Sequence, residues 1–94
     1  MSDFETRMEA LRSRFRSRAS DEAARLEAAL ATGDRSELLR ASHALVGNAG
    51  MFGFTELSQR AALIERAIDL DAGDDQIVGL ARTVTDMLKT MSSG

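Results

Sequence analysis

The 94-residue chain contains no cysteine, proline, tryptophan or tyrosine, and it has one histidine. Without cysteine it can form neither a disulfide framework nor a thiolate metal site, and a single histidine predicts no zinc site. Aromatic residues make up 4% of the chain, too few for a surface that stacks the bases of single-stranded nucleic acid. The net charge of −3 does not suit a protein that neutralises a phosphate backbone. We therefore expect no nucleic-acid partner.

The chain also lacks long apolar runs. The longest clear run, residues 61–64, is far short of the roughly 20 residues that a membrane-spanning helix needs. The start of the sequence has no basic stretch followed by an apolar one, so no signal peptide is expected. A length of 94 residues fits one domain with its own core. We therefore expect a single cytoplasmic domain over residues 1–94, without a membrane partner.

Four segments place apolar residues at spacings of three or four, which predicts four helices that each bury one face. The first stripe predicts a helix over about residues 3–31, either continuous or broken around residues 18–20 with Ser20 as an N-cap. Its members are Phe4, Met8, Leu11, Phe15, Ala19, Ala23, Leu26 and Leu30. The later stripes are Leu38, Ser42, Leu45, Ala49 and Phe52; Leu57, Ala61, Ile64 and Ile68; and Ile77, Leu80, Ala81, Val84, Met87, Leu88 and Met91.

The links between these segments are short. Gly33 suits the left-handed position after a helix end, and Asp34 followed by Glu37 has the spacing of a capping box. Because short links make consecutive helices antiparallel, the predicted fold class is all-α, an up-down antiparallel four-helix bundle with a long N-terminal helix. Residues 92–94 are expected to form a disordered tail.

His43 is the main candidate for chemistry near neutral pH. With about 100° of helix rotation per residue, His43 lies roughly 140° from Leu38 and from the core row that Leu38 begins. It should therefore face water, either as a reactive group or as an indifferent surface histidine. Gly47 follows one turn later on the same face and leaves the imidazole unshielded, although a helical glycine costs about 1 kcal/mol relative to alanine.

Leu39 and Val46 flank this histidine as an apolar strip, which fits either a docking patch or the edge of the core. Residues 42–54 resemble the signature of the histidine-containing phosphotransfer (HPt) domain, a pattern of His-x-Leu-Lys-Gly followed by a small residue and a glycine. The matching positions are His43, Leu45, Gly47, Ala49, Gly50 and Gly53. The resemblance spans most of residues 26–70, and the four-helix prediction agrees with the fold of that family.

The resemblance implies a phosphocarrier in a two-component phosphorelay. His43 would accept a phosphoryl group from a receiver-domain aspartate and pass it to another receiver. The implied partners are response-regulator receiver domains, a hybrid histidine kinase, or both, and the implied docking positions are Leu39, Val46 and Gly50. No cofactor is expected on this chain, since Mg²⁺ belongs to the receiver. With no glycine-rich nucleotide loop, the chain should not phosphorylate itself from ATP.

One position departs from the family pattern, because Val46 stands where a lysine is common. Arg40, three residues before His43, is the nearest cation that would replace that lysine, unless it is an ordinary surface arginine. Glu65 matches a position that contacts the imidazole in some family members, unless it is an ordinary boundary glutamate. These two residues and Gly47 are the candidate supporting residues.

Two alternatives to a phosphocarrier stay open at this point. Val46 is compatible with a non-catalytic module of the same fold that regulates a kinase or a receiver. The long first helix is compatible with a dimerising adaptor, although a monomer is expected. The same helix contains a run of basic residues that spread around its axis, so we interpret them as a solvated face. They are Arg12, Arg14, Arg16 and Arg18.

Overall fold

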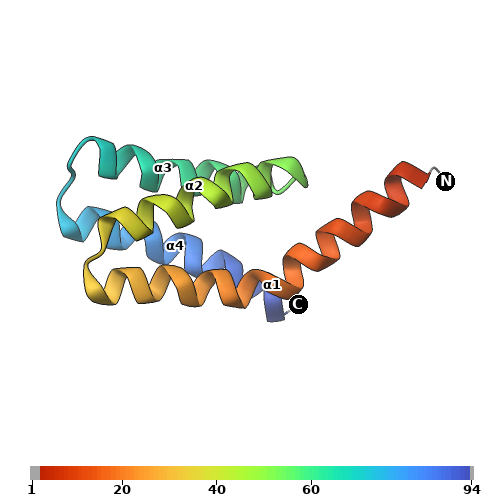
Figure 1. Cartoon of the computed structure of the whole chain (residues 1–94), viewed down its shortest axis with the longest axis horizontal. Coiled ribbons are helices and arrows are strands. Elements are labelled where there is room, and N and C mark those ends of the chain that lie inside the picture. Colours follow the sequence, from red (N-terminus) through yellow and green to blue (C-terminus); the bar gives the residue numbers. More distant parts are fainter. Residues whose placement is uncertain (1–2, 94) are drawn as a thin grey trace.

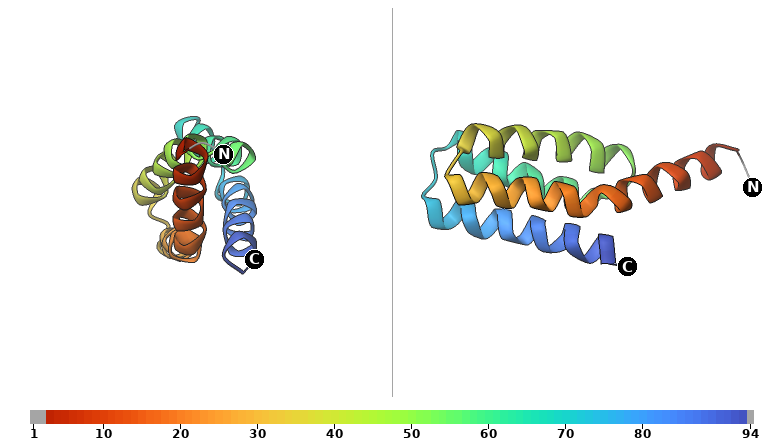
Figure 2. Two further views of the ribbon diagram at one scale, coloured as in Figure 1. Left: turned by 90° about the vertical axis from the view of Figure 1, so that its right-hand side faces the viewer. Right: turned by 60° about the horizontal axis from the view of Figure 1, so that its bottom comes forward.

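The computed structural model describes residues 3–93, which form four helices joined by short turns (Figure 1). They are α1 (Asp3–Thr32), α2 (Arg35–Met51), α3 (Thr55–Asp69) and α4 (Asp74–Ser93). Each helix packs on its neighbour in the chain, and α4 returns to pack on α1 (Figure 2). The predicted antiparallel four-helix bundle is confirmed. Within residues 3–93, none of the helices has the length and apolar character needed to cross a membrane.

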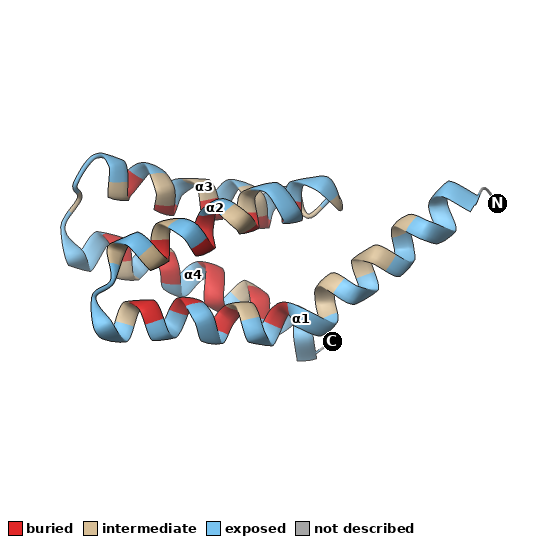
Figure 3. Cartoon of the chain, viewed as in Figure 1, coloured by how far each residue is buried: buried red, intermediate tan, exposed pale blue. Residues whose placement is uncertain are grey.

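One apolar stripe from each helix builds the core (Figure 3), as the spacing predicts. The largest fully buried apolar side chains are Leu26, Leu45, Ile64, Val84 and Leu88. Full burial of one such side chain contributes about 1.5–3 kcal/mol. The core therefore fixes which face of α2 turns inward, and with it which face is left to solvent.

The N-terminal part of α1 differs from the prediction. The helix passes residues 18–20 without interruption, so the broken alternative with a cap at Ser20 is wrong. Its fully buried residues begin at Ala19, Phe15 is half-buried against the core, and Phe4 is 69% exposed. The reason is length, because α1 has 30 residues while α2 has 17 and α3 has 15. The first turns of α1 project past the bundle and have no helix to pack against (Figure 1).

Aromatic packing joins the middle of α1 to the turn between α2 and α3. The rings of Phe15 and Phe54 stack with 5.1 Å between centroids, and Phe52 meets Phe15 edge-on at 6.2 Å. Arg12 Nε donates a 2.8 Å hydrogen bond to the carbonyl oxygen of Phe52. These contacts hold α1 beside the end of α2 that follows the candidate site.

The turn between α1 and α2 forms half of the expected capping box. Gly33 adopts a φ of +68°, and Asp34 accepts a 3.0 Å hydrogen bond from the backbone N–H of Glu37. The Glu37 side chain does not return to Asp34, because the backbone N–H of Asp34 donates to the carbonyl of Ala29 and two arginines bind Glu37. At the other end of the chain, the predicted tail is wrong for Ser92 and Ser93, which continue α4, and Gly94 lies outside the described residues.

Ser42 is an unfavourable residue within this core. Its Oγ is buried and has no hydrogen-bond partner among the described residues. We expect Ser42→Ala to raise the free energy of unfolding by roughly 1 kcal/mol, because alanine removes an unsatisfied hydroxyl and favours the helix. Urea denaturation measures the change. Ser58→Ala is the matched control, since Ser58 Oγ donates a 2.8 Å bond to Val46, and it should destabilise. A marked loss of stability in Ser42→Ala would contradict the expectation.

Candidate functional site

The imidazole of His43 stands on the outer surface of α2. Its side chain is 79% exposed, whereas the neighbouring Ser42 and Leu45 are buried in the core. The core row of α2 thus turns His43 to solvent, and the outward placement predicted from helix rotation is confirmed. Any reaction of this ring therefore takes place on an open surface.

Glu65 on α3 holds the ring from one side. Its Oε2 lies 2.8 Å from Nδ1 of His43, and the Glu65 side chain is only 22% exposed. A carboxylate accepts hydrogen bonds and donates none, so this contact favours the tautomer that carries the proton on Nδ1. In that tautomer the other nitrogen, Nε2, keeps its lone pair and faces no hydrogen-bond partner on Glu65. Packing of α2 against α3 thus holds the ring in one orientation and favours one tautomer.

A shallow open groove surrounds the histidine. Its lining residues come from α2 and α3, and they are Leu39, Arg40, His43, Ala44, Glu65 and Asp69. Sequence reasoning missed Asp69, although it follows Glu65 by one helical turn and so shares its face. The groove therefore contains two carboxylates and one guanidinium beside the imidazole. Among residues 3–93, no three metal-ligating side chains of His, Cys, Asp or Glu come together to hold a metal ion.

Gly47 and Gly50 differ in their surroundings. A Cβ built on Gly47 would meet no atom within 4 Å, so packing within the chain does not require a glycine there. A Cβ on Gly50 would lie 3.3 Å from Ser58 Oγ, where α2 and α3 approach closely. The close packing of α2 and α3 therefore explains a glycine at position 50. Gly47 leaves an open turn next to His43, and Val46 packs against the core as a half-buried edge residue.

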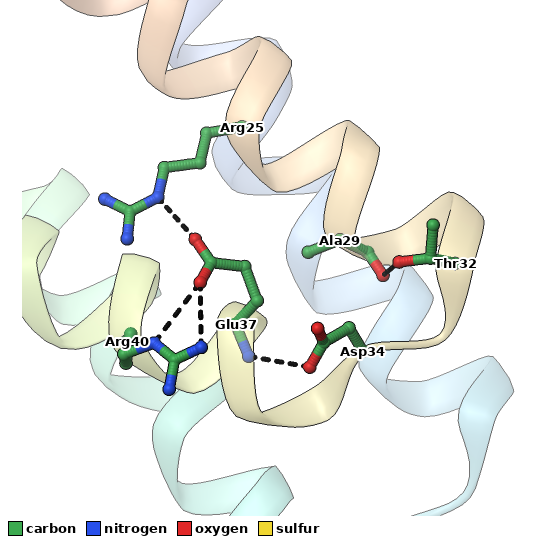
Figure 4. Close-up of polar contacts among 6 residues, drawn as sticks. All are labelled: Arg25, Ala29, Thr32, Asp34, Glu37 and Arg40. Atoms are coloured by element: carbon green, nitrogen blue, oxygen red, sulfur yellow. Dashed lines mark hydrogen bonds and ion pairs between the residues drawn. The ribbon is translucent and has the colours of Figure 1, made fainter.

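The guanidinium of Arg40 is engaged one turn before the histidine (Figure 4). Its Nε and Nη2 lie 3.2 and 3.1 Å from Oε2 of Glu37. The other oxygen of Glu37 accepts a 2.7 Å hydrogen bond from Nε of Arg25 on α1. The cation expected beside His43 therefore lines the groove but is paired with a carboxylate.

Two arginines also set the acidity of Glu37. The hydrogen bond from Arg25, followed by that from Arg40, lowers the pKa of Glu37 below its ordinary value. A carboxylate with a depressed folded-state pKa adds stability above its unfolded pKa and loses that contribution as pH falls through the folded value. Glu37 is therefore ionised at neutral pH and available to hold both guanidinium groups.

The Hpt domain family model matches residues 10–94 of the chain. No curated protein and no solved structure matches the chain significantly. The matched region contains His43, Glu65 and all of the groove.

Proposed function

Because the chain belongs to the Hpt domain family, we propose that His43 carries a phosphoryl group between receiver domains. Hpt domains are phosphocarriers of phosphorelays and interact with receiver domains and histidine kinases. The observation that carries the assignment to this residue is the exposed imidazole whose Nδ1 is bound by Glu65 at 2.8 Å. We infer that this domain acts as a monomeric carrier in the cytoplasm.

The transfer step uses the lone pair on Nε2. Nε2 attacks the phosphorus of an aspartyl phosphate, the P–N bond forms as the P–O bond to the aspartate breaks, and the aspartate leaves as a carboxylate. The ring gains a positive charge while Nδ1 keeps its proton. Glu65 accepts the Nδ1–H bond throughout and stabilises that charge. The reverse steps deliver the phosphoryl group to a second aspartate.

An open surface suits this chemistry because the receiver brings most of the machinery. Phosphoryl transfer needs positioning and neutralisation of negative charge more than covalent assistance. The receiver supplies its aspartate and Mg²⁺, and this chain supplies an oriented nucleophile. Gly47 leaves room for close approach, while Leu39, Val46 and Gly50 belong to the surface on which the receiver docks. A hydrolase would need further groups, including an oxyanion hole.

A panel of phosphorylated receivers tests the proposal. Each receiver is mixed with the chain, and phosphate on the chain is tested for lability in acid, as expected of phosphohistidine. We expect rapid labelling by at least one receiver and loss of the label when a second, unphosphorylated receiver is added. If docking occurs with no labelling by any receiver, the chain is instead a non-catalytic module of the same fold.

Glu65 gives a separate prediction. Glu65→Ala should slow phosphorylation of His43 roughly tenfold, since a hydrogen bond to a charged group contributes about 1.5 kcal/mol. Glu65→Gln keeps an acceptor for Nδ1–H and should recover part of the rate. Nitrogen-15 NMR of the imidazole supplies a second readout, because loss of the acceptor should increase the Nε2–H tautomer. An unchanged tautomer ratio in Glu65→Ala would show that Glu65 does not orient the ring.

A further inference from the structure

The cluster of Arg25, Glu37 and Arg40 lies beside the phosphoacceptor and has no part in the transfer chemistry described above. Glu37 uses a different oxygen for each arginine, Oε1 for Arg25 and Oε2 for Arg40. The side chain of Arg40 is 66% exposed, so few protein atoms restrict it. The side chain of Glu37 is 30% exposed. The most exposed side chain of this cluster is therefore the one that shares the groove with His43.

Arg40 has the same sequence distance to both possible partners. Glu37 precedes it by three residues and His43 follows it by three. Side chains three residues apart on a helix are neighbours, with roughly 5–6 Å between Cβ atoms. Arg40 and His43 also line the same groove. The long arginine side chain can therefore bind either Glu37 or a group attached to His43 without any change in the backbone.

The charges around His43 favour such a move after phosphorylation. Glu65 and Asp69 line the groove with the imidazole, so a phosphoryl group would be placed beside two carboxylates. Val46 stands at the usual lysine position and brings no positive charge. Arg40 is the cation among the groove-lining residues. A phosphoryl group carries more negative charge than a carboxylate and has three acceptor oxygens, which makes it the stronger partner for a guanidinium.

Arg25 lowers the cost of the exchange. When Arg40 leaves, the 2.7 Å bond from Arg25 still satisfies Oε1 of Glu37, and the Glu37 side chain remains 30% exposed to solvent. The negative charge of Glu37 therefore keeps a cationic partner in both arrangements. A single Glu37–Arg40 pair would lack this compensation.

We propose that Arg40 exchanges partners, binding Glu37 while His43 is free and binding the phosphoryl oxygens once His43 is phosphorylated. This inference rests on the proposed function. Glu37 is then a positioning residue that withdraws the cation from the free site, and Arg25 allows its release. Arg40 then supplies the positive charge that Val46 lacks, and it does so only when His43 is phosphorylated.

NMR of the chemically phosphorylated chain tests the exchange without any receiver. Phosphoramidate, a small phosphoryl donor, is used to phosphorylate His43. We expect the Nε–H resonance of Arg40 to shift on phosphorylation. Arg40→Ala should raise the titration midpoint of the phosphoryl group, followed by phosphorus-31 NMR, by roughly 0.2–0.7 pH units, the range that one exposed ion pair gives. Glu37→Gln should lower it, and this effect should shrink when Arg40 is also alanine.

Two matched variants control for charge alone. Glu27→Gln removes a carboxylate paired with Lys89 between α1 and α4, and Arg82→Ala removes an exposed arginine of α4. Both should leave the midpoint unchanged. An unshifted Arg40 Nε–H resonance together with a wild-type midpoint in Arg40→Ala would overturn the exchange. Normal chemical phosphorylation without transfer from any receiver would instead contradict the proposed function, so the two failures are distinct.

Discussion

Replacing His43 with glutamine is expected to abolish phosphorylation of the chain by receiver domains. Glutamine has similar reach, but its amide nitrogen is not a nucleophile, and the chain has no second histidine. The side chain is 79% exposed, so the free energy of unfolding should change by no more than about 0.5 kcal/mol. Acid-labile labelling and urea denaturation measure the two effects. Undiminished labelling of His43→Gln would end the assignment of this residue as phosphoacceptor.

The second large effect is expected at Gly47. Gly47→Gln places a long side chain in the open turn beside His43, where a receiver must approach the imidazole closely. Transfer should slow by roughly ten- to a hundredfold, since small errors in positioning are costly in such reactions. Stability should be unchanged or higher by up to about 1 kcal/mol, because a Cβ meets no atom there and glycine is a poor helix residue.

Gly79 supplies the control for that prediction. It is an exposed glycine within α4, and a Cβ built on it also meets no atom within 4 Å. Gly79→Gln should therefore raise stability by a similar amount while leaving transfer at the wild-type rate. If Gly47→Gln transfers as fast as Gly79→Gln, the open turn has no role in docking.

Much of the bundle follows from residue spacing alone. A three-to-four spacing places Leu45, Ile64 and Leu88 inward, and these residues form the core. The same rule fails at Phe4, because a stripe is buried only where another helix lies opposite. Because α2 and α3 are shorter than α1, no helix within residues 3–93 lies opposite Phe4. The continuous course of α1 through Ser20 likewise reflects packing of its neighbours Ala19 and Ala23, which outweighs a local capping preference.

The site could be predicted only in part. The outward direction of His43 depends on helix rotation within one element, which sequence fixes. The family resemblance implies a contact with Glu65, but the pairing itself depends on how α3 is aligned along α2, and no local pattern determines that alignment. Glu37 was interpreted as the second half of a capping box, but Arg25 reaches it from α1 and Arg40 from its own helix. Which group binds the Glu37 carboxylate depends on how α1 packs beside α2, and the local sequence does not specify that packing.

The most direct test that His43 is the phosphoacceptor is to locate the phosphoryl group on the chain after transfer from a phosphorylated receiver. Nitrogen-15 labelling of the chain allows the phosphorus–nitrogen coupling to be observed by NMR. We expect a single phosphoryl group on Nε2 of His43, because Glu65 occupies Nδ1 at 2.8 Å. A phosphoryl group on Nδ1, or on any residue other than His43, would contradict it.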